Sequence, residues 1–541
     1  MSARRKRTWK QQVRHTLRDG ARWTQGLPGP AGAAIGGAFR ALPESTPGKA
    51  RLRRILADYA SVASPSGDQV PAPTAPTVGR SAAPNAYRGF LHIADVGDTY
   101  TEREAVTLLQ LENAVLKRRL FREPLEPLPP TPHEDDDRDQ APERVARYLD
   151  LATSEQGEEG PLHLVVLAAY PSADNAYGNG FVHRRVMYFR RAGVRVHVAV
   201  VSASSEPGTY VHKGMPVIVG RGEELRHLLD TQSYASVGVH FLDRFQWERM
   251  RDHVSGHRLF AFMHGYESRR WIRTVRNHRT QQQLDDAVEH SITLQRFWRE
   301  VLAHPHGPER FVFVSRWWRR AAQEDLELVF PGRRTAIVHN VIDTDLFRYM
   351  PKDAEQRFKV LWVRSAANLN YGPDLAVAAL QRLRETPWWD RVQVRVIGDG
   401  KHFGLFEEAF AGDANVAVER RFADQAEIAR LHREYGIFLV PTRADSQGVS
   451  RDEAMASGLV PVTNRAAAIP EFTDEGCAVV AGYEDVGGLT DGMVRLMADP
   501  ALFTRMSAAA AARVRTQSSP EHTVAREMRM MGLTPEGEVG A

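Results

Sequence analysis

Residues Asp445 to Pro461 read DSQGVSRDEAMASGLVP. An apolar run at 436–441 precedes the acidic loop and another at 459–463 closes the stretch, so we expect two buried strands joined by a loop and a small-residue helix. Asp445 lies in the predicted loop and Glu453 on the predicted helix. In open α/β sheets, loops at the carboxyl ends of strands bind ligands, and a helix N-terminus there attracts phosphate. The stretch therefore predicts an α/β fold with a ligand site.

Apolar runs alternate with helical stretches on both sides of this segment, which is typical of parallel sheets covered on both faces. The strand candidates are residues 162–170, 194–202, 215–220, 236–241, 258–263, 310–315 and 335–340, and then 359–364, 391–398, 415–419, 436–441, 459–463 and 478–482. The helix candidates include residues 181–192, 373–385, 424–436, 450–458 and 484–516. The alternation restarts near residues 341–358, so we predict two Rossmann-like α/β domains facing a cleft.

The predicted organisation has four parts: a basic, Pro-rich, largely disordered extension with short helices (1–160), a first Rossmann-like domain (161–345), a second Rossmann-like domain (346–520), and a tail (521–541). Within the extension, residues 64–77 and 123–132 are Pro-rich and residues 133–139 are acidic. Such segments are typical of solvated linkers. Residues 106–120 have coiled-coil-like spacing, but two heptads are marginal in water, so a short helix on the chain's own body is the better interpretation.

Composition narrows the function classes. Of the 541 residues, 43% are hydrophobic, and the net charge of only +4 does not favour a nucleic-acid binder. The single cysteine, Cys477, excludes an intrachain disulfide framework. The sequence has no apolar run long enough for a membrane span, and no apolar segment that would make a secretory signal follows the basic N-terminal residues. We therefore expect a cytoplasmic protein. Residues 1–24 carry eight Arg or Lys against one acid. They predict either peripheral contact with the anionic inner face of a membrane or a solvated tail.

The motifs together resemble family 4 retaining glycosyltransferases, which have the GT-B fold of two Rossmann-like domains. That family carries an acidic pair, E-x7-E, leading into an EAMA-type helix, and here Asp445 and Glu453 take the two positions. The continuation ASGLVPV with AAIPEF at 467–472, and VHNVIDTDLF at 338–347, also match. The resemblance covers roughly residues 160–520. It implies that the first Rossmann-like domain takes the acceptor and that the second binds the nucleotide-sugar donor.

The resemblance implies roles for particular residues. Glu453 would hold the ribose hydroxyls of a nucleotide sugar, and Asp445 the hydroxyls of the transferred sugar, since carboxylates accept strong hydrogen bonds. The backbone around Gly448, Val449 and Ser450 would bind the diphosphate. The ordinary alternative is that Glu453 is simply a first-turn carboxylate favoured by the helix dipole.

Three further positions are implied in the same way. Arg364 would neutralise the leaving diphosphate, although a surface arginine at a strand end is the plainer interpretation. His264, in FAFMHGYES, would face the donor sugar. Gly178 and Gly180, in a Gly-rich loop after the first strand, would lie near the donor phosphates. A lone His at a strand end is more often structural, and GNG alone is only a turn.

The chain departs from the family pattern at two positions, and the first is Asp445, where the family has Glu. The second concerns the cations. Where the family has a Lys-Gly after the arginine, this sequence has Tyr371-Gly372. Arg364 is then either the sole cationic side chain, or another residue supplies the second charge. The Asp343-Thr-Asp345 triplet matches a metal-binding DxD pattern, but the resemblance already explains it as part of the interdomain junction. We expect no metal and no other cofactor.

The resemblance therefore implies a hexosyltransferase that uses a UDP- or GDP-sugar, retains anomeric configuration, and acts on a glycan or lipid-linked acceptor in cell-surface polysaccharide or glycoconjugate synthesis. Two alternatives stay open. One is another GT-B activity, such as a nucleotide-sugar epimerase or an inverting transferase. The other is a non-catalytic GT-B scaffold that binds a glycan or a protein, which the missing Lys-Gly favours. Nucleic-acid binding is a distant third, because no aromatic-basic platform is evident.

Overall fold

The computed structural model describes residues 125, 127–129, 131, 134–172, 179–278 and 280–534, except for the side chains at 275, 276, 281, 284 and 285. The basic segment 1–24 and the coiled-coil-like stretch 106–120 lie outside these residues. The chain divides into two units, one of residues 1–125 with 270–296 and one of residues 126–269 with 297–541. In the first unit the structure describes η2 (Trp271–Asn277) and the start of α10 (Gln281–Ala303). Both sheets of the structure belong to the second unit.

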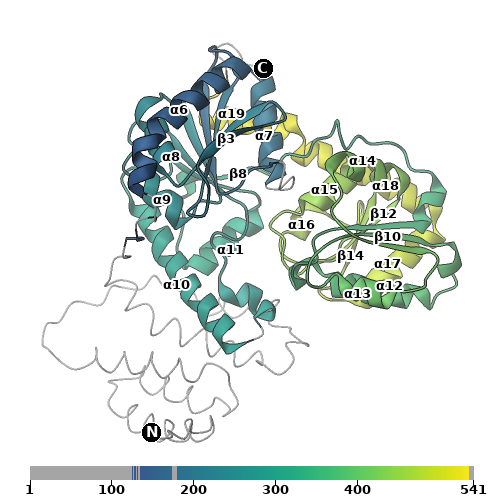
Figure 1. Cartoon of the computed structure of the whole chain (residues 1–541). Helices are drawn as coiled ribbons and strands as arrows, with labels where there is room; N and C mark the ends of the chain where they lie inside the picture. The colour runs from purple at the N-terminus through teal and green to yellow at the C-terminus, as the bar shows by residue number, and fades with distance from the viewer. Residues whose placement is uncertain are drawn as a thin grey trace, which may run out of the picture. The chain divides into compact units, whose positions relative to one another are not determined.

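An eight-stranded sheet forms the first domain (Figure 1). Its strand order is β3-β4-β2-β1-β5-β6-β7-β8. Its strands are β1 (Leu162–Leu167), β2 (Arg195–Val201), β3 (Gly208–His212), β4 (Met215–Gly220), β5 (Ser236–His240), β6 (Leu259–Met263), β7 (Arg310–Phe313) and β8 (Thr335–Ile337). All neighbours pair in parallel except β3, which is antiparallel to β4. The helices include α6 (Glu134–Gln156), α7 (Gly180–Arg191), α8 (Glu223–Thr231), α9 (Arg244–Met250) and α11 (Arg316–Leu326).

A six-stranded parallel sheet forms the second domain, in the order β11-β10-β9-β12-β13-β14. Its strands are β9 (Lys359–Val363), β10 (Gln393–Gly398), β11 (Val416–Arg420), β12 (Ile437–Leu439), β13 (Val460–Asn464) and β14 (Val479–Ala481). The helices of this part are α12 (Pro373–Arg384), α13 (Gly404–Ala409), α14 (Gln425–Glu434), α15 (Val449–Ala456), α16 (Ile469–Phe472), α17 (Val486–Ala498) and α18 (Pro500–Ser518).

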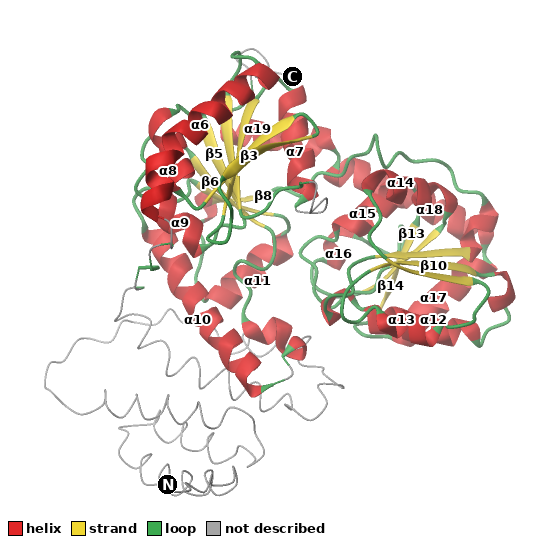
Figure 2. Cartoon of the chain, viewed as in Figure 1, coloured by secondary structure: helices red, strands yellow, loops and turns green. Residues whose placement is uncertain are grey.

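Helices cover both faces of the second sheet (Figure 2). Successive side chains of a strand point to opposite faces. Val360 and Trp362 accordingly join one apolar cluster with residues of α12 and α17, whereas Leu361 joins another with residues of α14 and α15. Burial on both faces explains why the strands read as continuous apolar runs. The predicted pair of Rossmann-like domains is confirmed.

Four local expectations need correction. The acidic run at 133–139 is not a solvated linker: residues from Glu134 onward form α6, and Asp137 is buried beside Arg221. Strand β3 was not predicted, because its half-exposed GTYVH sequence lacks an apolar run. The expected helix 484–516 is two helices, since Asp499 caps α18 and a proline disfavours helical backbone in the residue before it.

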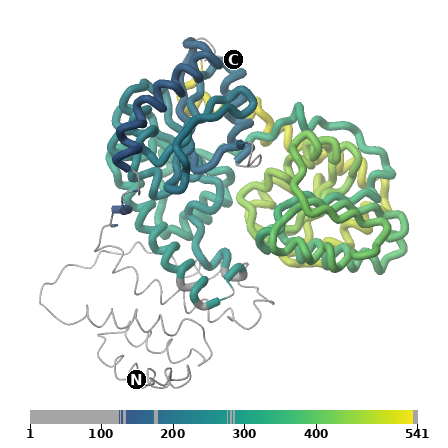
Figure 3. Tube along the Cα trace, in the orientation of Figure 1, coloured from purple at the N-terminus to yellow at the C-terminus, as the bar shows by residue number. Residues whose placement is uncertain are grey.

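The fourth correction concerns the expected tail at 521–541. Residues Pro520–Met531 form helix α19, which packs on α7 of the first domain, and the yellow end of the trace in Figure 3 returns there. Val524, Met528 and Met531 join the same apolar cluster as Val182. The domain boundaries themselves stay a prediction. No helix in the described part of the chain is long and apolar enough to cross a membrane.

Candidate functional site

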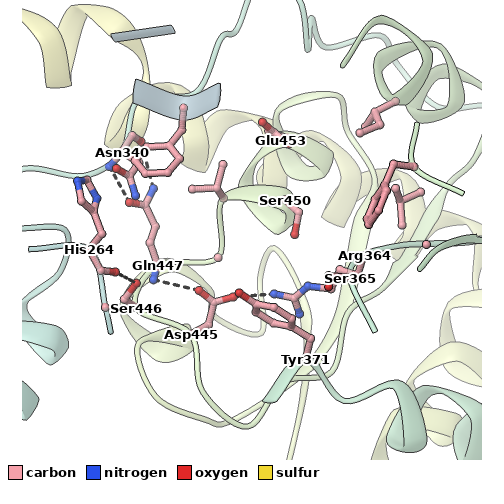
Figure 4. Close-up of a pocket in the computed structure, with 18 of the residues that line it drawn as sticks. His264, Asn340, Arg364, Ser365, Tyr371, Asp445, Ser446, Gln447, Ser450 and Glu453 are labelled. Carbon is pink, nitrogen blue, oxygen red and sulfur yellow. Dashed lines mark hydrogen bonds and ion pairs between the residues drawn. The ribbon is translucent and has the colours of Figure 1, made fainter. Parts of the chain in front are cut away.

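A pocket of about 570 Å³ is lined by residues of both domains (Figure 4). From the first domain come residues that follow strand ends, among them His264 and Asn340. From the second come Arg364, Tyr371, the β12–α15 loop and the first turn of α15. Because the carboxyl ends of parallel strands meet at one edge of a sheet, residues far apart in the sequence gather there. Of the predicted site residues, His264, Arg364, Asp445, Gly448, Val449, Ser450 and Glu453 all line this pocket.

Arg364, which follows β9, is held on two sides. Its Nη2 lies 2.7 Å from Oδ2 of Asp445, and its guanidinium carbon lies 4.4 Å from the centre of the Tyr371 ring. Only 7% of the Arg364 side chain is exposed. A charged hydrogen bond and a cation–π contact therefore fix the guanidinium at the pocket wall. The Tyr371 ring is thus a platform on which the arginine rests.

The first turn of α15 forms another part of the wall. Gly448 precedes it with φ of 96°, and a Cβ there would lie 2.9 Å from Nη1 of Arg451, so the position requires glycine. Val449 and Ser450 begin the helix and line the pocket. A helix N-terminus presents backbone N–H groups and a positive dipole end. This turn therefore has the features of an anion site.

Glu453 lies one turn into α15 and is 4% exposed. Its carboxylate is 2.8 Å from Nη2 of Arg184, which comes from α7 of the first domain. Burial raises the pKa of Glu453, whereas Arg184 acts to lower it. Sequence reasoning missed Arg184, because nothing in the pattern of α7 distinguishes it from the other arginines of that helix.

His264 follows β6 and is buried. Its Nε2 lies 2.9 Å from Nδ1 of His240, and burial, with a smaller effect of Arg185, holds its pKa well below the usual value. The imidazole is therefore neutral at ordinary pH. Its backbone is fixed as well: the carbonyl oxygen accepts a hydrogen bond from Ser446 Oγ, and Glu267 accepts from the backbone N–H.

The predicted Gly-rich loop contributes differently. Gly178 lies outside the described residues, and Gly180 begins α7 without lining the pocket. Asn179 precedes the helix in the left-handed region, and its Nδ2 donates to the carbonyl of Ala169 at 2.8 Å. The next residue, Phe181, does line the pocket, with its ring 4.9 Å from that of His264.

Gln447 joins the two domains beside the pocket and was also missed. Its side chain accepts a hydrogen bond from the Asn340 backbone N–H at 2.6 Å and donates to the Asn340 carbonyl at 3.1 Å. Both residues lie inside motifs that the sequence analysis quoted, DSQGVS and VHNVID. Their pairing was not foreseeable, because it depends on how the two domains meet.

The DxD triplet has a local role. Asp343 Oδ1 accepts hydrogen bonds from the backbone N–H groups of Asp345 at 3.2 Å and Leu346 at 3.0 Å. Within the described ranges, no group of three or more His, Cys, Asp or Glu residues could hold a metal ion. The expectation that the chain needs no metal or other cofactor stays a prediction.

Residues 357–499 match the family model described as "Glycosyl transferases group 1". The chain has the GT-B fold, and its second domain is of the group 1 glycosyltransferase type. Sucrose-phosphate synthase from Thermosynechococcus elongatus superposes with a TM-score of 0.53 at 16% identity, covering 69% of this chain and 98% of that one. HepE of Anabaena in complex with UDP gives 0.51 at 13% identity, covering 69% and 99%. No curated protein sequence matches the chain.

The group 1 domain contributes most of the pocket wall. It contains Arg364, Tyr371, Asp445 and the α15 turn, whereas His264 and Asn340 come from the first domain. The matched residues thus coincide with the part of the chain where carboxylates, a cation and a helix N-terminus lie together. This coincidence is the basis for assigning a function.

Proposed function

We propose that this protein is a family 4 glycosyltransferase that transfers a hexose from a UDP- or GDP-sugar to a glycan or lipid-linked acceptor with retention. The observation that carries the proposal is the gathering of Glu453, Asp445 and Arg364 around the α15 N-terminus, within a group 1 domain. This set of groups complements a nucleotide sugar. It offers a carboxylate for a ribose diol, backbone N–H groups for phosphate, and a polar wall for a hexose.

In the proposed complex, Glu453 accepts hydrogen bonds from the ribose hydroxyls, and the turn at Gly448, Val449 and Ser450 receives the diphosphate. Asp445 and the neutral imidazole of His264 contact the hexose. The HepE structure contains UDP in the same fold, which supports UDP as the first nucleotide to test. No cofactor enters this scheme.

For transfer, the bond between the anomeric carbon and the diphosphate oxygen breaks, and the acceptor hydroxyl oxygen bonds to the anomeric carbon on the same face. The bonding electron pair stays on the departing diphosphate, so negative charge develops there, near Arg364. The acceptor hydroxyl proton passes to this departing phosphate. A charged side chain stabilises a transition state best when it is already oriented toward the atom on which charge develops. The Asp445 and Tyr371 contacts supply that orientation. We place this reaction in the synthesis of cell-surface polysaccharide or glycoconjugate.

A thermal-shift and calorimetric screen of UDP- and GDP-sugars tests donor binding. We expect the wild type to be stabilised by one nucleotide, since a ligand that binds only the native state raises its stability by mass action. Glu453→Ala should weaken binding at least ~10-fold, because it removes charged hydrogen bonds. Glu475→Ala, which removes an exposed carboxylate, is the matched control. Absence of any nucleotide binding by the wild type would contradict the proposal.

The scaffold alternative rests on one specific observation. Arg364, the cation expected to face the diphosphate, is already paired with Asp445, and Tyr371 stands where the family has lysine. NMR of the reaction mixture separates the possibilities. A new glycosidic linkage with the donor's anomeric configuration supports retaining transfer, and an inverted anomer indicates an inverting enzyme. Conversion of the sugar without an acceptor indicates an epimerase, and donor binding with no product at all indicates the scaffold.

A further inference from the structure

Arg184 makes a two-pronged contact with the group 1 domain. Its Nη2 lies 2.8 Å from Oε1 of Glu453, and its Nη1 donates to Oε1 of Gln425 at 2.7 Å. Both partners line the pocket, and the arginine reaches them from α7 in the first domain. The Arg184 and Glu453 side chains are 13% and 6% exposed. The contact is therefore largely shielded from water. Charge interactions are stronger in such a shielded environment than in water.

The surroundings of Glu453 make a positive partner necessary. A buried carboxylate is costly unless it is paired and hydrogen-bonded. Asp452 on α15 and Asp343 after β8 both oppose ionisation of Glu453, although Asp452 is itself paired with Arg451 at 2.6 Å. His432 on α14, packed behind it, is buried with a pKa lowered to about 3, so it carries no charge near neutrality. Arg184 is the cation that contacts the carboxylate.

We propose that Arg184 is a positioning residue: it keeps the Glu453 carboxylate ionised and oriented toward the ribose diol, so that an arginine of the first domain completes the nucleotide site of the second. This inference rests on the proposed function, because it takes Glu453 as the ribose ligand. It adds a residue to the donor site that the sequence motifs do not contain.

The chemistry of the diol explains why the charge state matters. An ionised carboxylate accepts from both ribose hydroxyls at once, whereas a protonated carboxyl has turned one oxygen into a donor. Hydrogen bonds to an ionised acceptor are also about twice as strong. Loss of Arg184 leaves the pKa of Glu453 governed by burial and by two nearby acids, all of which raise it. The diol then loses its best acceptor at neutral pH and regains it as the pH rises.

The test compares UDP with 2′,3′-dideoxy-UDP, and GDP with its dideoxy analogue, by calorimetry at pH 7 and pH 8.5. We expect the wild type to bind the diol form roughly 10- to 100-fold more tightly, as for hydrogen bonds to a charged group. In Arg184→Gln this preference should fall to about threefold or less at pH 7 and recover partly at pH 8.5. Arg184→Lys should keep most of the preference. Arg191→Gln, on the exposed side of the same helix, is the matched control.

Distinct outcomes overturn the inference. If Arg184→Gln binds UDP more tightly than the wild type at both pH values, Arg184 competes with the ribose instead of supporting it. If the variant loses affinity equally for UDP and its dideoxy analogue, the contact only holds the domains together. Arg184→Lys, with its melting temperature checked, keeps the test valid should Arg184→Gln fold poorly. Failure of the proposed function looks different: the wild type binds no nucleotide, or Glu453→Gln retains the full diol preference.

Discussion

At the scale of single residues, the unusual feature of this site is the support of Arg364 by Tyr371. The guanidinium lies over the ring and against Asp445, with little exposure to water. Cation–π contacts gain strength when they are desolvated. The aromatic ring and the carboxylate therefore fix the orientation of the Arg364 guanidinium.

Two substitutions at Tyr371 test this interpretation. Tyr371→Phe keeps the ring and should leave nucleotide affinity within about twofold of the wild type. Tyr371→Ala removes the ring and with it a cation–π contact of about 1–2 kcal/mol. Nucleotide binding, measured by calorimetry, should therefore weaken roughly 5- to 30-fold. If Tyr371→Phe were as damaging as Tyr371→Ala, the hydroxyl and not the ring would be the functional group.

Some residues of the pocket lie in a short sequence motif that marks them, whereas others contact the pocket only because of the tertiary structure. That Asp445 and Glu453 lie at one pocket was predictable, because one short stretch holds the strand end, the turn and the helix start. The contact between Arg184 and Glu453 was not predictable, because it depends on how α7 meets α15, and α7 carries four arginines. Local sequence patterns encode how an element begins and ends. They do not encode which side chain of a helix meets another domain.

At the scale of secondary structure, strands buried on both faces were the most predictable elements. Every predicted strand exists, because parallel strands need apolar residues on both sides. Errors lie where that signal is weak: the half-exposed edge strand β3, the acidic start of α6, and the break before Pro500. Helix α19 was taken for a tail because its apolar residues meet a partner elsewhere in the fold.

The ion pair between α7 and α19 gives a prediction at this scale. Arg185 Nε lies 2.7 Å from Oε2 of Glu527, and both side chains are 1% exposed. Removing one partner of a buried pair leaves an uncompensated charge, so Glu527→Ala should lower the free energy of unfolding by about 3–5 kcal/mol. Urea unfolding measures the loss. Arg526→Ala, exposed on the same helix, should change little. If Glu527→Ala lowered the free energy of unfolding by less than about 1 kcal/mol, the ion pair would not stabilise the packing of α19 on α7.

At the scale of the whole molecule, buried histidines distinguish this fold. Burial lowers the pKa values of His163, His183 and His197 to about 4 and that of His432 to about 3. Both domains are involved, since His432 belongs to α14 and the others to the first domain. Each of these rings stays neutral in the native state at a pH where the unfolded chain protonates it. The unfolded state therefore binds more protons below about pH 6.5.

These four histidines should consequently contribute a loss of stability as the pH drops from about 6.5 toward 4. Each histidine has a lower pKa in the native state than in the unfolded chain. Its contribution to the free energy of unfolding is therefore complete above the unfolded pKa and is lost at lower pH, as protons bind the unfolded chain. One pKa unit corresponds to about 1.36 kcal/mol, and the unfolded histidine is already half protonated at pH 6.5, so His163 alone should contribute a loss of about 1.6 kcal/mol between pH 6.5 and pH 5. Urea unfolding across this range measures the slope. His163→Asn should flatten the slope by that amount, although it also lowers stability at pH 7 by removing the contacts to Ser236. His522→Asn, which changes an exposed ring, should leave the slope unchanged. A slope unaffected by His163→Asn would mean that this ring takes up its proton in the native state as well.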